Sequence, residues 1–204
     1  MIAKIAIRAC YLLFLFVFSL SSNAQLKADF NSFPANGCSP LLVQFSDVST
    51  GNPTQWRWDL GNGTISFLKN PSVTYFDPGQ YNVKLVIRNA AGTSDSVTKT
   101  SYITVFAKPA VDFTSDVTIG CYPLTVKFTD KSVPMSGTIV SRQWDFGDGN
   151  ASDEMNPEHV YIGSGNYNVT LREVNSNGCV TTLSKTSYIK ITSGVKADFT
   201  NTIP

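Results

Sequence analysis

The sequence predicts an all-β chain made of tandem two-sheet sandwiches, and three observations support this prediction. Apolar and polar residues alternate in short stretches, as in residues 43–45 and 81–87, which is the pattern of strands with one buried face. Clusters rich in Gly, Pro and Asp, such as residues 77–79 and 147–149, separate these stretches as turns do. About seven such stretches fill each unit of about 85 residues, which suits a small β-sandwich domain.

The composition narrows the classes of protein to which the chain can belong. Its 204 residues include 16 Lys and Arg against 15 Asp and Glu, and 42% of them are hydrophobic. Such a chain is too apolar and too weakly charged to be disordered, and it lacks the positive charge that binding nucleic acid requires. The only histidine is His159, which excludes chemistry that needs two.

Residues 1–24 are predicted to be a secretory signal peptide. Lys4 and Arg8 precede an apolar run over residues 9–20, and small residues precede a cleavage site after Ala24. The run is about 12 residues long, whereas a transmembrane helix needs about 20. We therefore expect a secreted or cell-surface protein with no membrane insertion after cleavage, the alternative being an uncleaved anchor.

The rest of the sequence is a tandem repeat, with one copy over residues 25–107 and a second over 108–193. The beginning of the first copy, residues 27–30, recurs in the second, and it returns again as Lys196-Ala197-Asp198-Phe199. Residues 194–204 are therefore predicted to begin a third, truncated repeat. Since a domain does not end a few residues into its first strand, we expect the chain to be a piece of a longer protein, the alternative being a gene product that is cut short. The short linker near Pro109, which has no Gly/Ser stretch, predicts a fairly stiff joint.

Each copy has a central tryptophan followed by a turn motif. We expect Trp58 and Trp144 to be the main aromatic residues of the two cores. The motif residues are Trp58, Asp59, Gly61 and Gly63 in the first copy, and Trp144, Asp145, Gly147 and Gly149 in the second. Glu173 stands where the first copy has the core residue Ile87, so we expect either a bulge that turns Glu173 outward or a position at the rim.

The motif Trp-Asp-Phe-Gly-Asp-Gly at 144–149, together with residues 156–161 and 165–171, resembles the PKD domain family. The first copy departs from the pattern at Asn62 and at Val73, which stands where the second copy has His159. The resemblance implies immunoglobulin-like β-sandwiches without catalytic activity. The Gly-Cys-x-Pro-Leu opening of each copy is similar to the PKD arrays of secreted surface proteins of gliding bacteria, which implies a gliding-motility or adhesin-like setting.

Three cysteines remain after the predicted cleavage, and an exported protein can form a disulfide. We predict a bridge between Cys121 and Cys179, since Cys121 precedes a strand and Cys179 lies in a late loop of the same copy. The alternative is that both thiols are free. The first copy has Thr93 in place of Cys179, which leaves Cys38 either as a free thiol shielded by packing or in an intermolecular bridge.

An acidic segment of the second copy has two interpretations. The first is a turn, in which the Asp side chains bind nearby backbone groups and Gly takes a positive φ. The second is a Ca²⁺ site, because four carboxylates of the type that Ca²⁺ prefers lie close in sequence: Asp145, Asp148, Asp153 and Glu154. We expect no other cofactor.

No catalytic residues are predicted. The sequence contains no HExxH, no Gly-x-Ser-x-Gly and no phosphate-binding glycine loop.

Phe67 and Phe76 lie in loop-like sequence, where exposed aromatic rings can contact a sugar or a protein partner, although they can equally cover the ends of the sandwich.

We therefore expect a non-catalytic adhesion or spacer module of a larger secreted or surface protein, which binds an extracellular glycan or protein weakly and repeatedly. The alternative is an accessory region of a secreted protease or glycosidase, whose catalytic domain lies outside this chain.

Overall fold

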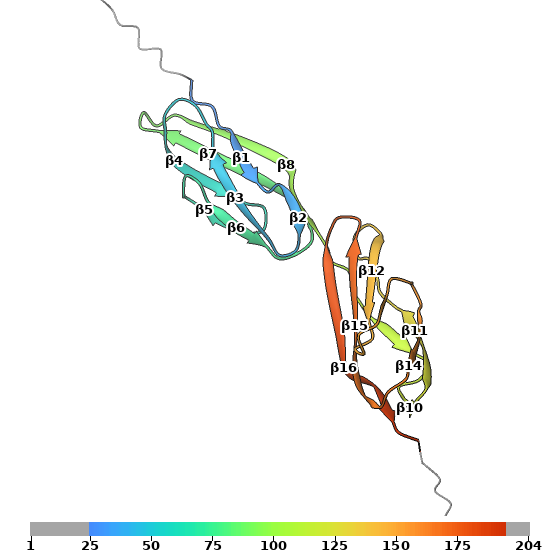
Figure 1. The fold of residues 1–204 in the computed structure, drawn as a ribbon. Helices are drawn as coiled ribbons and strands as arrows, with labels where there is room; N and C mark the ends of the chain where they lie inside the picture. The colour runs from blue at the N-terminus through green and yellow to red at the C-terminus, as the bar shows by residue number, and fades with distance from the viewer. Residues whose placement is uncertain (1–24, 195–204) are drawn as a thin grey trace, which may run out of the picture.

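The computed structural model describes residues 25–194, and each half of this segment forms its own β-sandwich (Figure 1). The prediction of an all-β chain of tandem sandwiches is confirmed. The predicted signal peptide and nearly all of the predicted third repeat lie outside the described residues. Within those residues, no helix is long and apolar enough to cross a membrane.

The first domain has a three-stranded sheet, β1-β3-β6, packed on a five-stranded sheet, β2-β8-β7-β4-β5. Its strands are β1 (Phe30–Phe33), β2 (Asn36–Cys38), β3 (Leu41–Asp47), β4 (Pro53–Asp59), β5 (Ile65–Ser66), β6 (Ser72–Tyr75), β7 (Gly79–Asn89) and β8 (Ser94–Phe106). All pairs are antiparallel except β2, which runs parallel to the end of β8.

The second domain repeats this arrangement with the sheets β14-β11-β9 and β10-β16-β15-β12-β13. Its strands are β9 (Phe113–Ser115), β10 (Ile119–Cys121), β11 (Leu124–Asp130), β12 (Ile139–Asp145), β13 (Ala151–Ser152), β14 (Glu158–Tyr161), β15 (Gly165–Asn175) and β16 (Val180–Thr192). Strand β10 runs parallel to the end of β16, as β2 does to β8. The two domains lie end to end, and the β15–β16 hairpin of the second faces the first (Figure 1).

A fully buried tryptophan joins the two sheets of each domain. Trp58, on β4 of the larger sheet, lies 5.2 Å from Phe30 and 5.6 Å from Phe45 of the smaller sheet, measured between ring centroids. Its indole Nε1 donates a hydrogen bond of 2.9 Å to the carbonyl of Leu68, so the N–H is satisfied in the core. Trp144 makes the equivalent contacts with Phe113, Phe128 and the Glu154 carbonyl.

The turn after each tryptophan brings two backbone segments into close contact. Gly61 has a φ of +80°, and a Cβ atom there would lie 2.2 Å from the carbonyl oxygen of Asn82 on β7. The side chain of Asp59 accepts a 3.0 Å hydrogen bond from the Gly61 N–H, and the Tyr75 hydroxyl donates one of 2.7 Å to the carbonyl of Leu60. The second domain repeats these contacts with Asp145, Gly147 and Tyr161. The motif thus needs Asp to close the turn and Gly to admit the neighbouring strand.

Glu173 is fully buried, so the expectation of a bulge or a rim position is wrong. No register shift separates Leu171 from Glu173, and the side chain points into the core in phase with its strand. It faces Arg142, whose Nε lies 3.2 Å from Glu173 Oε1 and 2.7 Å from Asp130 Oδ2. The first domain has Trp56 in place of Arg142 and Ile87 in place of Glu173, and the Trp56 indole donates to Asp47. In both domains the residue on the first strand of the pair donates a hydrogen bond to an aspartate, and its neighbour on the next strand is Ile87 in the first domain and Glu173 in the second.

The buried glutamate should make the stability of the second domain depend on pH. Burial, followed by the nearby Asp130 carboxyl, raises the pKa of Glu173 from 4.5 to about 7. Between these values the folded domain holds a proton that the unfolded chain has released, so stability falls as pH rises from about 4.5 to about 7. Glu173→Gln should raise the free energy of unfolding by roughly 2–3 kcal/mol at pH 8 and change it little below pH 4.5.

Denaturant unfolding of residues 25–194 at pH 4.5 and pH 8 measures this difference. The exposed Glu158, which lies 3.6 Å from Lys127, supplies the control, because Glu158→Gln should shift both values by less than about 1 kcal/mol. Equal destabilisation by Glu173→Gln at both pH values would show that the ion pair with Arg142 outweighs the burial of the charge.

The two turn glycines of the second domain should differ in their tolerance of alanine. Gly147 and Gly149 have φ values of +80° and +92°, but only at Gly147 would a Cβ meet the backbone, 2.3 Å from the carbonyl oxygen of Asn168. Gly149→Ala should therefore cost about 1–2 kcal/mol, the conformational term alone. Gly147→Ala should cost about 4 kcal/mol or more, because β15 must also move. Thermal unfolding of the two variants tests this, and equal losses would contradict it.

Candidate functional site

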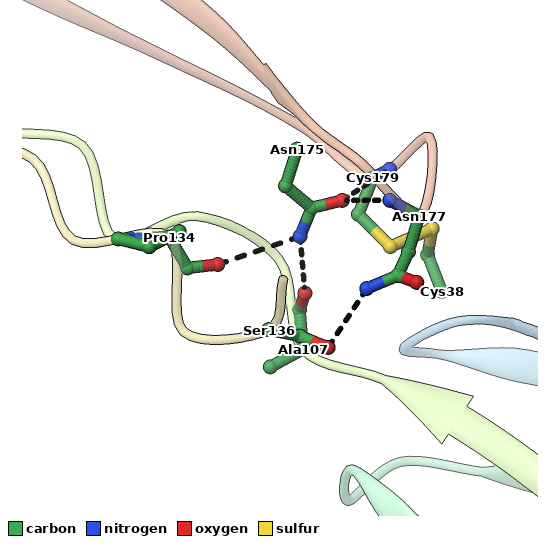
Figure 2. The surroundings of a disulfide bond; sticks show 7 residues. All are labelled: Cys38, Ala107, Pro134, Ser136, Asn175, Asn177 and Cys179. Carbon is green, nitrogen blue, oxygen red and sulfur yellow. Dashed lines mark hydrogen bonds between the residues drawn. A yellow bond between two sulfur atoms is a disulfide. The ribbon is translucent and has the colours of Figure 1, made fainter. Parts of the chain in front are cut away.

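A disulfide bond joins the two domains. Cys38, the last residue of β2, is bonded to Cys179 in the turn between β15 and β16, with their Cα atoms 5.5 Å apart (Figure 2). The two residues are 141 positions apart in the sequence. The domains are thus connected covalently at two points, by the peptide chain after β8 and by this bridge.

The predicted bridge between Cys121 and Cys179 is wrong, and so is the expectation that Cys38 has no disulfide partner within the chain. Cys121 pairs in register with Thr192 at the end of β16, whereas Cys179 precedes the first residue of that strand. A strand of that length spans roughly 40 Å. A disulfide requires Cα atoms within about 7 Å. Cys121 is exposed and free.

A buried asparagine holds the cysteine-bearing turn and ties it to the linker. The Asn175 Oδ1 atom accepts hydrogen bonds from the N–H groups of Asn177 and Cys179, at 3.1 and 3.0 Å. Its Nδ2 donates a 3.0 Å hydrogen bond to the carbonyl of Ala107 in the linker between the domains (Figure 2). Asn177 Nδ2 donates to the Ser136 hydroxyl from the neighbouring loop. The sequence reasoning missed Asn175.

A signal for this turn exists in the repeat itself. The first domain has Asn89 at the place of Asn175, and its Oδ1 accepts a 3.0 Å hydrogen bond from the Thr93 N–H. The same asparagine turn therefore occurs in both copies, and the second adds a cysteine to it.

The acidic segment of the second domain forms turns. Asp145 Oδ1 accepts a hydrogen bond from the Gly147 N–H, and Asp148 Oδ1 accepts one from the Asn150 N–H. The structure does not bring Asp145, Asp148, Asp153 and Glu154 together as a set of ligands. In residues 25–194, no group of three or more His, Cys, Asp or Glu side chains is arranged to hold a metal ion.

The single histidine is part of this acidic turn. His159 Nε2 lies 2.7 Å from Asp148 Oδ2, and its ring stacks on Phe146 with 4.2 Å between centroids. Burial raises the pKa of Asp148, but the hydrogen bonds with His159 and Asn150 outweigh burial and hold this pKa below its usual value. Both carboxylate oxygens of Asp148 thus already have partners within the protein.

Of the two aromatic candidates, Phe67 lines a hollow that Phe76 does not reach. Phe67 and Phe76 are both 70% exposed. Phe67 lines a shallow hollow of about 600 Å³ on the outer side of β4 and β7, together with Arg57, Val86 and Arg88. In the part of the chain that the structure describes, neither Arg57 nor Arg88 takes part in an ion pair. The hollow therefore combines apolar side chains with two positive charges that form no ion pair among the described residues.

The second domain lacks this combination. Register and sequence place Gln143 where Arg57 stands, Asp153 where Phe67 stands and Val174 where Arg88 stands. The two domains therefore differ in charge and shape at this place on their surfaces.

Comparison with known proteins places both domains in one family. The family model described as the PKD domain matches residues 25–105 and 106–191. The pre-pro-metalloprotease PrtV of Vibrio cholerae is 27% identical over 149 residues, which are 72% of this chain and 16% of that protein. Collagenase ColA of Clostridium perfringens is 33% identical over 182 residues, which are 81% of this chain and 16% of that protein. The chain therefore spans about a sixth of the length of these relatives.

Solved structures of single domains are also similar. The PKD1 domain of Vibrio anguillarum Epp shares 29% identity with a TM-score of 0.37, covering 42% of this chain and 96% of that one. The PKD1 domain of the Vibrio cholerae metalloprotease PrtV shares 29% identity with a TM-score of 0.34, covering 39% and 95%.

Removing the disulfide should loosen the joint without unfolding either domain. Each sandwich has its own core, so Cys38→Ser with Cys179→Ser should leave both domains folded. The linker peptide and the bond from Asn175 to Ala107 then remain, and one such hydrogen bond contributes only about 1 kcal/mol. The distribution of distances between spin labels on β4 and β12 should broaden, whereas Cys121→Ser should leave it unchanged. An equally narrow distribution in the double variant would contradict this.

Proposed function

The chain belongs to the PKD domain family, and from that premise we propose that residues 25–193 are a non-catalytic, stiff arm of a secreted hydrolase. The observation that carries this proposal is the disulfide between Cys38 and Cys179, which links the two domains covalently at a second point. The arm sets the distance and orientation between a catalytic domain elsewhere in the protein and whatever holds that protein in place.

The relatives favour a hydrolase as the parent protein. PrtV is a metalloprotease and ColA is a collagenase, and the matching segment is a small part of each. A disulfide suits an exported protein, because it persists in an oxidising compartment. The one histidine of the chain is bound to Asp148 and stacked on Phe146, which suits a structural role better than general-base chemistry.

A two-point joint is the physical basis of the spacing role. A single flexible linker lets a domain explore many orientations, which dilutes its local concentration near a fixed target. The second covalent link and the hydrogen bond from Asn175 to the linker restrict this freedom before any binding occurs. A catalytic domain held by such an arm loses less entropy when it meets an extended or insoluble substrate.

Deletion in the parent protein tests the proposal. Removing residues 25–193 should leave turnover of a small soluble substrate within about twofold and lower turnover of a fibrous substrate by roughly tenfold, the size expected for loss of effective concentration. The Cys38→Ser, Cys179→Ser variant should show part of the loss on the fibrous substrate only. A parent protein without a hydrolase domain, or an equal loss on both substrates, would overturn the proposal.

The hollow beside Phe67 favours adhesion to an acidic glycan as a second function. An exposed aromatic ring can stack on the apolar face of a sugar, and a guanidinium can pair with a uronate or sulfate group. Phe67, Arg57 and Arg88 bring these two kinds of group together on one sheet face.

Phe76 provides a matched control for this second function, since it is as exposed as Phe67 but does not line the hollow. Binding of an oligouronate to residues 25–194 should have a Kd in the millimolar range, corresponding to about −4 kcal/mol. Phe67→Ala should weaken it about fivefold or more, a loss of about 1 kcal/mol, and Phe76→Ala should not. Calorimetric titration measures both, and equal effects of the two substitutions would exclude the hollow as the binding site.

A further inference from the structure

We propose that Cys121 is the attachment point for a further PKD domain that follows residue 193. In this proposal Cys121 forms with a cysteine in the hairpin turn of that domain the same kind of disulfide that Cys38 forms with Cys179. The inference concerns the assembly of the chain and does not depend on the proposed hydrolase function.

The backbone surrounding Cys121 is the same as that surrounding Cys38. Cys38 is the last residue of β2 and lies in register with Phe106, and Cys121 is the last residue of β10 and lies in register with Thr192. The N–H of Ser39 donates to the Phe106 carbonyl at 3.0 Å, and that of Tyr122 donates to the Thr192 carbonyl at 3.3 Å. The two sulfur atoms therefore start from equivalent places on their domains, and one of them is already bonded to a neighbouring domain.

The position of Cys121 is at the exit of the second domain. In the first domain the chain leaves β8 beside Cys38 and enters the next sandwich, and the bridge forms across that junction (Figures 1 and 2). In the second domain the chain leaves β16 beside Cys121, which is exposed and has its sulfur 3.6 Å from Thr192 Oγ1. A domain that follows β16 as the second domain follows β8 would present its hairpin to this thiol.

The positions of the cysteines in the two copies are consistent with pairing from each copy to the next along the chain. The first copy has the exit cysteine, Cys38, and Thr93 in its hairpin, whereas the second has both an exit cysteine and the hairpin Cys179. This is the pattern of a series in which each exit cysteine pairs with the hairpin of the next copy. The sequence Lys196-Ala197-Asp198-Phe199 repeats the start of a copy, and Asp198 follows Thr192 at the same spacing as Asp112 follows Phe106.

The bond forms by thiol–disulfide exchange with a disulfide donor of the exporting compartment. Two thiols lose two protons and two electrons as the S–S bond forms, and the disulfide of the donor is reduced to two thiols. The partner is thus a hairpin thiol of a following PKD domain, and the donor is a protein or small-molecule disulfide.

A three-copy chain tests the proposal. Residues 25–204 are continued with a second segment 119–193, which completes a third copy because 194–204 correspond to 108–118. The added segment carries Cys121→Ser, so that it contributes only its hairpin cysteine. The matched control also carries Cys179→Thr in the added segment, the residue found in the first copy. Both chains are oxidised in a glutathione buffer and alkylated without denaturant.

Native Cys121 should be alkylated almost completely in the control and at least about tenfold less in the three-copy chain. Peptide mapping should then show Cys121 bonded to the added hairpin cysteine, together with the bond between Cys38 and Cys179 in both chains. Full alkylation of Cys121 in a three-copy chain that retains the Cys38–Cys179 bond would overturn the proposal.

An intermolecular version decides the matter if the three-copy chain does not fold. The second domain has its own sheets and core, so residues 108–193 with Cys121→Ser can be mixed as a separate protein with residues 25–204. Mixed disulfides between Cys121 and the hairpin cysteine should exceed symmetric Cys121 dimers by about tenfold. A statistical ratio of the two products would overturn the proposal.

Discussion

Each sandwich depends on a buried tryptophan that contacts both sheets. Trp58 packs on Phe30 and Phe45 from the opposite sheet, and its N–H binds a carbonyl of the loop after β5. The chain must turn immediately after this residue, and the turn is so close to β7 that only glycine fits at position 61. Core, loop and turn are therefore fixed by one side chain. The same set of contacts surrounds Trp144, although the residues around the two cores have diverged.

The sequence was sufficient for the fold but not for the joint. Period-two alternation, turn residues and the internal repeat predict tandem sandwiches, and the structure confirms them. The predicted pairing of Cys121 with Cys179 was wrong because the two residues lie at opposite ends of β16, although they belong to the same copy. The sequence does not show that β2 runs parallel to β8 and β10 runs parallel to β16, which places each cysteine beside the C-terminal end of the long strand. The prediction for Glu173 was wrong for a related reason. Its partner Arg142 lies on a different strand, and the alternation of residues along one strand does not reveal such a partner.

The two copies show how one fold accepts different interiors. The first domain pairs Trp56 with the buried Ile87 on neighbouring strands, and the second has Arg142 and the buried Glu173 at the same places. In both, the first residue of the pair donates to an aspartate, Asp47 or Asp130. The frame is thus kept by a hydrogen bond to a carboxylate, while the residue beneath is free to change. The differences on the outer face of β4 and β12 show the same freedom at the surface.

The interdomain disulfide also determines what happens when the chain is pulled from its two ends. Tension applied at residues 25 and 194 passes through β1 and β2 to Cys38, crosses the sulfur atoms to Cys179, and leaves along β16. The residues between the two cysteines, with a sequence separation of 141, are outside this covalent load path. If both domains unfolded while the disulfide stayed intact, the segment between the two cysteines would therefore not be extended. This segment has a contour length of roughly 490 Å, at about 3.5 Å per residue. A tether built this way stays short under load, and its length changes abruptly only when the bridge is reduced.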